Sequence, residues 1–182
     1  MNITIKQVPN ILTSIRIVLI PIICVLMYVD ISSTRILAII FTALACITDK
    51  IDGEIARKYD CCSAFGKCMD PIADKTLVAS LIIMLVYLDK AYIFPCIIIL
   101  FREFVVSGIR EFVSKERGLT INVSKLAKIK TFSQMFSLFF LMLVGDNYWL
   151  LLFGNILLII SAILSIITSY QYIYSVRKVI FE

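Results

Sequence analysis

Residues 148–174 read YWLLLFGNILLIISAILSIITSYQYIY, a continuous run without one charged side chain. A helix needs roughly 20 predominantly apolar residues to cross the hydrocarbon core of a bilayer. Elsewhere the chain repeats apolar stretches of similar length, separated by short polar connections. Their lengths predict an all-α polytopic membrane protein with about six transmembrane helices, at 9–29, 34–57, 68–88, 91–114, 123–145 and 148–174.

The composition is typical of a membrane protein, because 60% of the 182 residues are hydrophobic. Soluble domains average closer to half. No linker, repeat or low-complexity segment interrupts the chain, so we expect one membrane domain over residues 1–182. The formal net charge is +5. Since the bases are dispersed at segment ends, with no basic arm or nucleic-acid-binding motif, the expected partner is the lipid bilayer and not a nucleic acid.

The placement of lysine and arginine predicts the orientation of the spans. Basic residues are enriched in cytoplasmic connections. Here they gather at both ends of the chain and after the second and fourth spans, which predicts a multi-pass protein of the cell (inner) membrane with both termini in the cytoplasm. The residues concerned are Lys6, Arg57, Lys58, Lys67, Lys115, Arg117, Lys125, Lys128, Lys130, Arg177 and Lys178.

Cysteine and histidine usage limits the chemistry of any site. The chain has six cysteines, none in a C-x-x-C pair, and no histidine. A zinc site is therefore not expected. A general base that works near neutral pH must be another group, most simply a carboxylate.

Four aspartates flank the connection between the second and third spans. On a helix, Asp49 and Asp52 share one face because they lie three residues apart, and so do Asp70 and Asp74, which lie four apart. A short hairpin would bring the two pairs together. Two like charges about 4 Å apart repel by about 4 kcal/mol at an effective dielectric constant of about 20. Converging carboxylates therefore need protons or cations, and oxygen ligands alone favour Mg²⁺ or Mn²⁺.

A simpler interpretation treats these aspartates as a solvated helix end, with Asp70 as the N-cap of the third helix and Pro71 in its first turn. The neighbouring small residues favour a binding site. Gly53 costs a helix about 1 kcal/mol relative to alanine, and it lets a ligand approach the backbone. Together with Ala56 it leaves one helix face without bulky side chains, which suits the binding of a flat base and a diphosphate.

The same residues follow the spacing D-x2-D-G-x2-A-R-x8-G-x3-D-x3-D over residues 49–74, without a gap. This segment resembles the signature of the CDP-alcohol phosphatidyltransferase family. The resemblance implies a six-helix membrane fold, usually homodimeric, with a two-metal centre at the cytoplasmic ends of the helices. It also implies an enzyme that transfers the phosphatidyl group of CDP-diacylglycerol to a small alcohol and releases CMP.

Residue by residue, the resemblance implies that Asp49 and Asp70 bridge two Mg²⁺ or Mn²⁺ ions, with Asp52 on one ion and Asp74 on the other. Asp74 is also the implied catalytic residue, because it would accept the proton of the attacking hydroxyl. The residues implied to bind the donor, CDP-diacylglycerol, are Asn10, Ile11, Leu12, Thr13, Gly53, Arg57, Ser63 and Gly66.

Two further segments bear on the acceptor alcohol. Residues 9–16 are similar to the P-N-x-L-T-x2-R opening of family members that use glycerol 3-phosphate, although Asn10 or Thr13 could simply cap the first helix. Residues 128–134 are similar to the K-x-K-T-x2-Q of the same members, although Ala127 replaces the glycine that many of them place before the first lysine. A run of bases that only sets topology is the alternative.

We expect Arg110, Lys128 and Lys130 to bind the phosphate of the acceptor. Glycerol 3-phosphate is then the expected acceptor, and phosphatidylglycerol phosphate the product. For Arg102, deep in an apolar run, a structural ion pair and a ligand role remain open, and Glu103 shares a helix face with Arg110. The alternatives are family members with serine, inositol phosphate or phosphatidylglycerol as acceptor, and a cation-pathway or transporter protein outside the family.

Overall fold

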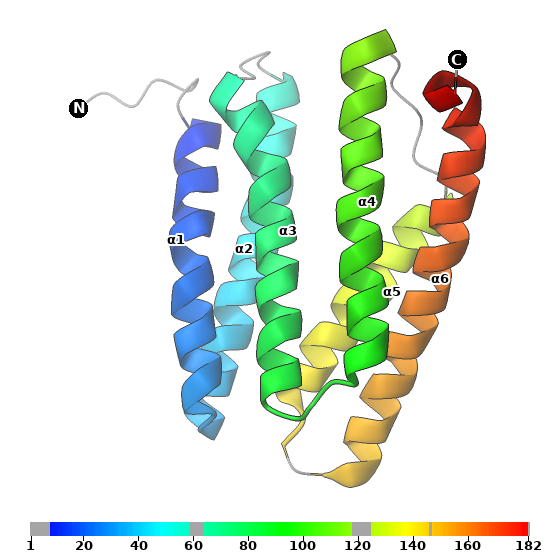
Figure 1. Ribbon diagram of the computed structural model, residues 1–182. Helices are drawn as coiled ribbons and strands as arrows, with labels where there is room; N and C mark the ends of the chain where they lie inside the picture. The colour runs from blue at the N-terminus through cyan, green and yellow to red at the C-terminus, as the bar shows by residue number, and fades with distance from the viewer. Residues whose placement is uncertain (1–7, 59–63, 118–124, 146, 182) are drawn as a thin grey trace. The chain divides into compact units, whose positions relative to one another are not determined.

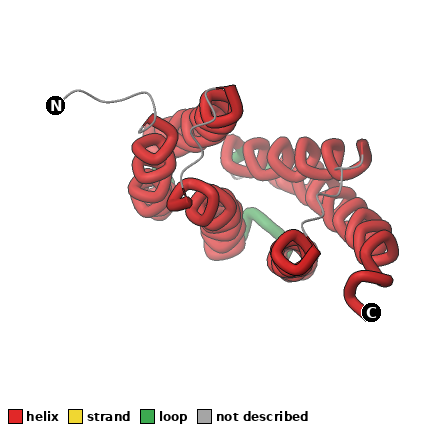
Figure 2. Tube along the Cα trace, turned by 90° about the horizontal axis from the view of Figure 1, so that it is seen from above, coloured by secondary structure: helices red, strands yellow, loops and turns green. Residues whose placement is uncertain are grey.

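The computed structural model describes residues 8–58, 64–117, 125–145 and 147–181, and the side chains of 11–49, 66, 69–114, 126–145 and 147–177. Within these ranges the regular structure is helical, with no strand (Figure 2). The all-α prediction is confirmed, and each predicted span overlaps one helix. The helices are α1 (Val8–Val29), α2 (Ser32–Lys58), α3 (Ala64–Tyr87), α4 (Ile93–Arg117), α5 (Lys125–Leu143) and α6 (Tyr148–Phe181).

The start of α3 differs from the prediction. The helix begins at Ala64, so Asp70 and Pro71 lie inside it and Asp70 is not its N-cap. The simpler interpretation, in which Asp70 is the N-cap of this helix, was therefore wrong. A proline inside a helix removes one backbone hydrogen bond, and the helix continues through it here. The Asp70 carboxylate meanwhile accepts a hydrogen bond from Thr13 of α1 (2.5 Å), a tertiary contact that local capping preferences do not anticipate.

Short turns connect the helices wherever the connection is described. Asp30, between α1 and α2, and Asp89, between α3 and α4, adopt left-handed backbone angles with φ of 47° and 56°. Aspartate tolerates this region better than most residues. Ahead of α6, Asn147 Oδ1 accepts hydrogen bonds from the backbone N–H groups of Trp149 (3.1 Å) and Leu150 (3.2 Å), which is N-capping geometry.

The chain divides into two compact units, Met1–Met84 and Leu85–Glu182. In the first unit, α1, α2 and α3 run alternately down and up (Figure 1), and α1 packs along α2. Its core consists of apolar side chains that are almost completely buried, such as Ile23, Ala45 and Leu81. The small alanine lets the helices approach each other closely.

In the second unit, α6 packs against both α4 and α5. Its core includes the buried side chains of Ile99, Leu138 and Leu158. Gly154 of α6 faces α5 so closely that a Cβ atom there would lie 2.5 Å from Leu141 Cδ2. Glycine suits this crossing, because an added methyl group would force the Leu141 side chain to move.

A buried asparagine ties α6 to the segment that precedes α4. Asn155 Oδ1 accepts a hydrogen bond from the backbone N–H of Tyr92 (2.7 Å), and its Nδ2 donates to the carbonyl of Lys90 (3.0 Å). The first bond satisfies a backbone N–H at the start of α4, where no intrahelical partner exists, and the second satisfies a carbonyl of the preceding turn. The polar side chain thus fixes the position of α4 within its unit.

Four helices in the described part of the chain are long and apolar enough to span a membrane: Ile11–Val29, Ser32–Asp49, Leu126–Leu143 and Tyr148–Arg177. Much of their surface is apolar and exposed, as lipid contact requires. Helices α3 and α4 carry charged residues such as Asp74 and Arg102 within their length. The arrangement is that of a polytopic membrane protein, with charge concentrated in particular helices.

Candidate active site

In the first unit, three of the four predicted metal ligands meet two side chains of α1. Arg16 Nη1 donates to Asp49 Oδ1 of α2 at 2.6 Å and to Asp74 Oδ1 of α3 at 3.0 Å. Thr13 Oγ1 donates to Asp70 Oδ1 of α3 at 2.5 Å. We call these five residues the aspartate–arginine cluster. The structure therefore brings Asp49, from the C-terminal half of α2, together with both described aspartates of α3, as a hairpin between the two helices would require.

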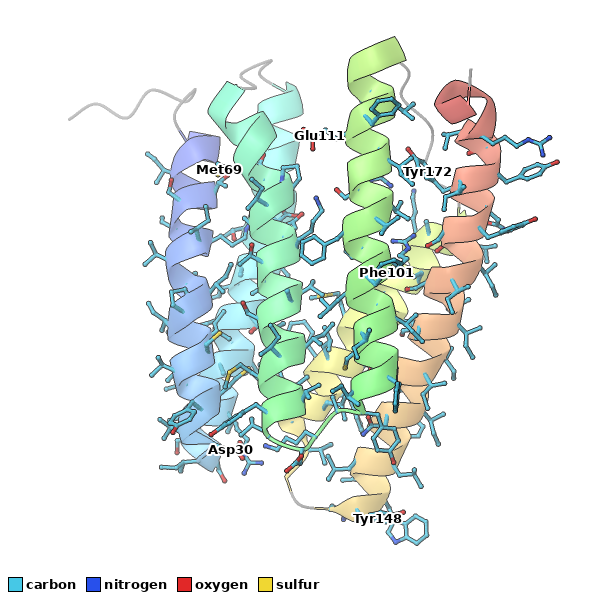
Figure 3. The ribbon with its side chains drawn as sticks, viewed as in Figure 1. Asp30, Met69, Phe101, Glu111, Tyr148 and Tyr172 are labelled. Atoms are coloured by element: carbon cyan, nitrogen blue, oxygen red, sulfur yellow. The ribbon has the colours of Figure 1, made fainter. Side chains whose placement is uncertain are left out.

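Helical periodicity explains how each element presents its side chains. Thr13 and Arg16 lie three residues apart on α1, and Asp70 and Asp74 lie four apart on α3, so each pair occupies one helix face. Met69, next to Asp70, and Asp30, in the turn between α1 and α2, are labelled at opposite ends of this unit (Figure 3). The cluster thus lies towards the end of the unit at which α3 begins.

The cluster is closed on one side and open on the other. The side chain of Arg16 is completely buried, whereas those of Asp49 and Asp74 are 36% and 52% exposed. A buried guanidinium is costly unless it is paired, and here it is paired with two carboxylates. The exposed carboxylate oxygens remain accessible to a ligand from the other side.

The donor atoms of the cluster suit a hard divalent cation. Each ionised carboxylate has about four acceptor positions, so one hydrogen bond leaves others available. Oxygen ligands favour Mg²⁺ or Mn²⁺. Among the described side chains, no three acidic, cysteine or histidine groups complete a metal site by themselves. Asp52, the fourth predicted ligand, belongs to α2, but its side chain lies outside the described residues.

The residues predicted to bind the donor are only partly described. Ile11 is exposed, Leu12 is half-buried, and Gly66 is buried within α3. Thr13 is completely buried and bonded to Asp70. Its hydroxyl therefore faces the aspartates. The sequence had predicted that Thr13 borders the donor site. Ser63 and the side chains of Asn10 and Arg57 lie outside the described residues, as does any detail around Gly53.

In the second unit, one carboxylate connects two cations from different helices. Glu103 Oε2 of α4 accepts hydrogen bonds from Lys130 Nζ of α5 (2.6 Å) and from Arg102 Nη1 of α4 (3.2 Å). Lys130 is 2% exposed. The shared helix face suggested a relation between Glu103 and Arg110, and sequence reasoning did not identify Lys130 as the partner. We call Arg102, Glu103 and Lys130 the interhelical ion network.

Arg102 is also held by α6. Its Nε donates to Ser169 Oγ (2.8 Å) and to the carbonyl of Ser165 (3.3 Å), and its Nη2 donates to Thr168 Oγ1 (3.0 Å). All these partners lie on one face of α6, at i, i+3 and i+4. The geometry assigns Arg102 the structural ion pair that the sequence left open beside a ligand role.

The other two predicted phosphate ligands differ from Lys130 in exposure. Arg110 and Lys128 are both exposed. The Arg110 guanidinium lies 5.7 Å from the centroid of the Tyr172 ring of α6, within the range of a cation–π interaction. Gln134, one turn after Lys130, is 3% exposed, and its Oε1 has no hydrogen-bond partner among the described residues. That atom can accept a hydrogen bond from a bound hydroxyl or water.

Comparison with known proteins covers both units. Residues 6–167 match the family model described as CDP-alcohol phosphatidyltransferase. A protein of Rickettsia felis is 46% identical over 176 residues, which make up 95% of this chain and 97% of that protein. A protein of Rickettsia typhi is 48% identical over 170 residues, 92% of this chain and 95% of its own length.

A more distant relative comes from Salmonella choleraesuis. It is 31% identical over 174 residues, which are 94% of this chain and 95% of that protein. The three relatives share one name, CDP-diacylglycerol–glycerol-3-phosphate 3-phosphatidyltransferase. The similarity therefore spans the aspartate–arginine cluster and the interhelical ion network alike.

Proposed function

Because this chain belongs to the CDP-alcohol phosphatidyltransferase family, we propose that it transfers the phosphatidyl group of CDP-diacylglycerol to glycerol 3-phosphate. The products are phosphatidylglycerol phosphate and CMP. The observation that carries this proposal is the shared name of relatives that are 46–48% identical over 92–95% of this chain. The family is known to use divalent metal ions, and the oxygen-rich cluster between α1, α2 and α3 supports such a centre.

Four aspartates are proposed to hold two Mg²⁺ or Mn²⁺ ions: Asp49, Asp52, Asp70 and Asp74. Bound divalent ions would neutralise the diphosphate of the donor and stabilise the departing CMP. The hydrogen bonds from Thr13 and Arg16 support this assignment, since they orient three of these carboxylates from the buried side. The donor itself is proposed to contact residues 10–13 together with Gly53, Arg57, Ser63 and Gly66.

Asp74 is proposed as the general base. The hydroxyl oxygen of the acceptor forms a bond to the phosphorus on the lipid side of the donor diphosphate. The bond from that phosphorus to the bridging oxygen breaks, and CMP leaves with the electron pair. Asp74 takes the proton of the attacking hydroxyl. Its 52% exposed side chain supports this role, because a substrate can reach it.

The phosphate of the acceptor is proposed to bind Arg110, Lys128 and Lys130. Charge-assisted hydrogen bonds to phosphate are stronger than neutral ones. Arg110 and Lys128 are exposed and available to a ligand. Lys130 is bonded to Glu103 through one of its three N–H donors, so it can bind a phosphate oxygen through another.

The location and orientation of the enzyme in the cell are also proposed. We propose a multi-pass protein of the inner membrane with both termini in the cytoplasm, where CDP-diacylglycerol and glycerol 3-phosphate meet it. The basic connections after the second and fourth predicted spans support this orientation. A homodimer is proposed from the family resemblance.

The test is a panel of acceptors with the purified protein in detergent and labelled CDP-diacylglycerol. We expect CMP release with glycerol 3-phosphate in Mg²⁺ or Mn²⁺, and none after treatment with EDTA until metal is restored. Serine, inositol phosphate, phosphatidylglycerol and unphosphorylated glycerol serve as comparison acceptors. A faster reaction with any of these would overturn the proposed acceptor, and full turnover in chelated protein would overturn the metal centre.

A further inference from the structure

The two α1 residues of the aspartate–arginine cluster reach carboxylates on other helices. Thr13 and Arg16 are both completely buried. Their polar atoms contact Asp70, Asp49 and Asp74, which lie 57, 33 and 58 residues away along the chain. These contacts therefore join the three helices of the first unit at the proposed metal centre.

A second buried threonine of this unit, Thr42, serves as a comparison for Thr13. Thr42 is also completely buried, but its Oγ1 donates to the carbonyl of Ala38 in its own helix, at 2.7 Å. Threonines inside helices commonly bond in that way. Thr13 donates to the Asp70 carboxylate of another helix, and such charge-assisted bonds are shorter and stronger than neutral ones. Its hydroxyl therefore contributes to the orientation of an aspartate.

Arg16 has the corresponding effect on the other two carboxylates. One nitrogen atom, Nη1, bonds both Asp49 Oδ1 and Asp74 Oδ1. The guanidinium is planar and its donors have fixed directions, so it holds both carboxylates in one relative orientation. It also offsets the repulsion between the two like charges of Asp49 and Asp74.

We propose that Thr13 and Arg16 are positioning residues of the metal centre, which hold Asp49, Asp70 and Asp74 from the buried side and so orient these carboxylates for divalent cations. This inference rests on the proposed function. It adds to the proposed donor contact of Thr13 a bond to a carboxylate, and it gives the N-terminal half of α1 a defined part in metal binding. Groups that orient metal ligands typically contribute 10- to 100-fold to metal affinity or activity.

Substitutions of two buried threonines distinguish the orientation of the Asp70 carboxylate from a general effect of changing a buried side chain. Thr13→Val removes the hydroxyl but keeps the shape, and Thr42→Val makes the same change at an equally buried site that does not touch an aspartate. Mn²⁺ binding to the purified full chain in detergent, without substrate, is followed by electron paramagnetic resonance. We expect Thr13→Val to weaken Mn²⁺ binding about 10- to 100-fold, Thr42→Val to leave it unchanged, and Thr13→Ser to restore it.

Substitutions of Arg16 distinguish the effect of its positive charge from the effect of the directions of its hydrogen bonds. Arg16→Met removes the charge and the donors, whereas Arg16→Lys keeps the charge on a shorter reach. Arg35→Met is the control, since Arg35 pairs with Asp30 (3.6 Å) in the same unit, away from the aspartates of the cluster. We expect Mn²⁺ affinity to fall most in Arg16→Met, less in Arg16→Lys, and not at all in Arg35→Met.

The outcomes distinguish the inference from the function on which it rests. Unchanged or tighter Mn²⁺ binding in both Thr13→Val and Arg16→Met would overturn the positioning role while leaving the proposed activity intact. Failure of the unmodified protein to bind Mn²⁺ would overturn the metal centre itself. If Arg16→Met does not fold, the comparison between Thr13→Val, Thr13→Ser and Thr42→Val still decides the matter.

Discussion

Replacing Asp74 with asparagine separates the hydrogen-bonding role of this residue from its proposed catalytic role. Asp74 Oδ1 accepts a hydrogen bond from Arg16 Nη1 at 3.0 Å. An asparagine Oδ1 can accept the same bond, so the contact between α1 and α3 survives. The amide cannot take a proton from an attacking hydroxyl. We therefore expect a folded variant that binds CDP-diacylglycerol and turns over slowly.

The size of the loss follows from the exposure of the carboxylate. General bases contribute about 10²- to 10⁴-fold to rate, and each tenfold corresponds to about 1.36 kcal/mol. The Asp74 side chain is 52% exposed. Water can reach an attacking hydroxyl at such a position and take over part of the proton transfer. We therefore expect a loss of about 10²-fold in kcat, or about 2.7 kcal/mol.

The assay measures CMP release at saturating glycerol 3-phosphate and Mg²⁺, so that a weaker metal affinity does not imitate a slower chemical step. Asp89→Asn is the control, because Asp89 is exposed in the turn after α3 and asparagine adopts its φ of 56° equally well. A kcat for Asp74→Asn comparable to that of Asp89→Asn would refute the reasoning and require another base.

Three further variants test the second unit. Arg110→Ala should raise the KM for glycerol 3-phosphate by roughly 10- to 100-fold. Arg177→Ala is the control, since Arg177 also lies over a tyrosine of α6. A KM for Arg110→Ala no higher than that for Arg177→Ala would contradict a phosphate-binding role of Arg110. Glu103→Gln should lower the free energy of unfolding by about 1.5–3 kcal/mol, because both cations of the interhelical ion network lose their carboxylate; an unchanged denaturation midpoint would contradict this. Gly154→Ala should cost about 1–3 kcal/mol through overpacking, whereas Gly108→Ala, with open space around it, should not; similar midpoints for the two would count against a tight crossing of α5 and α6.

The sequence predicted those features that depend on neighbouring residues. Apolar runs of bilayer length located each of the six helices that the described residues form, and the spacing of Asp70 and Asp74 placed them on one face. The start of α3 was missed because Asp70 followed by Pro71 is typical of a helix start, whereas the chain from Ala64 onward continues the helix through both residues. Because Asp70 lies inside the helix, its carboxylate does not serve as an N-cap, and it accepts a tertiary bond from Thr13.

The partners of buried charges could not be predicted from spacing. Periodicity related Glu103 to Arg110 because they lie seven residues apart on α4. In the structure Glu103 bonds Lys130, 27 residues away on α5. Likewise, nothing in residues 9–16 indicates that Arg16 lies between Asp49 and Asp74. Such contacts depend on how helices pack, which a one-dimensional pattern does not contain.

The buried arginines show why the charges within these helices do not oppose the fold. An arginine at the centre of a membrane helix costs about 2.5–3.5 kcal/mol on insertion scales. Arg16 meets two aspartates from α2 and α3, and Arg102 meets Glu103 and three residues of α6. Apart from Glu103, which is the neighbour of Arg102, these partners lie far away along the chain, so the bonds form only when the helices of each unit pack in this arrangement. The cost of placing an arginine in an apolar helix therefore becomes a preference for one helix packing over its alternatives. In the first unit that packing is also the one that brings the carboxylates of the proposed metal centre together.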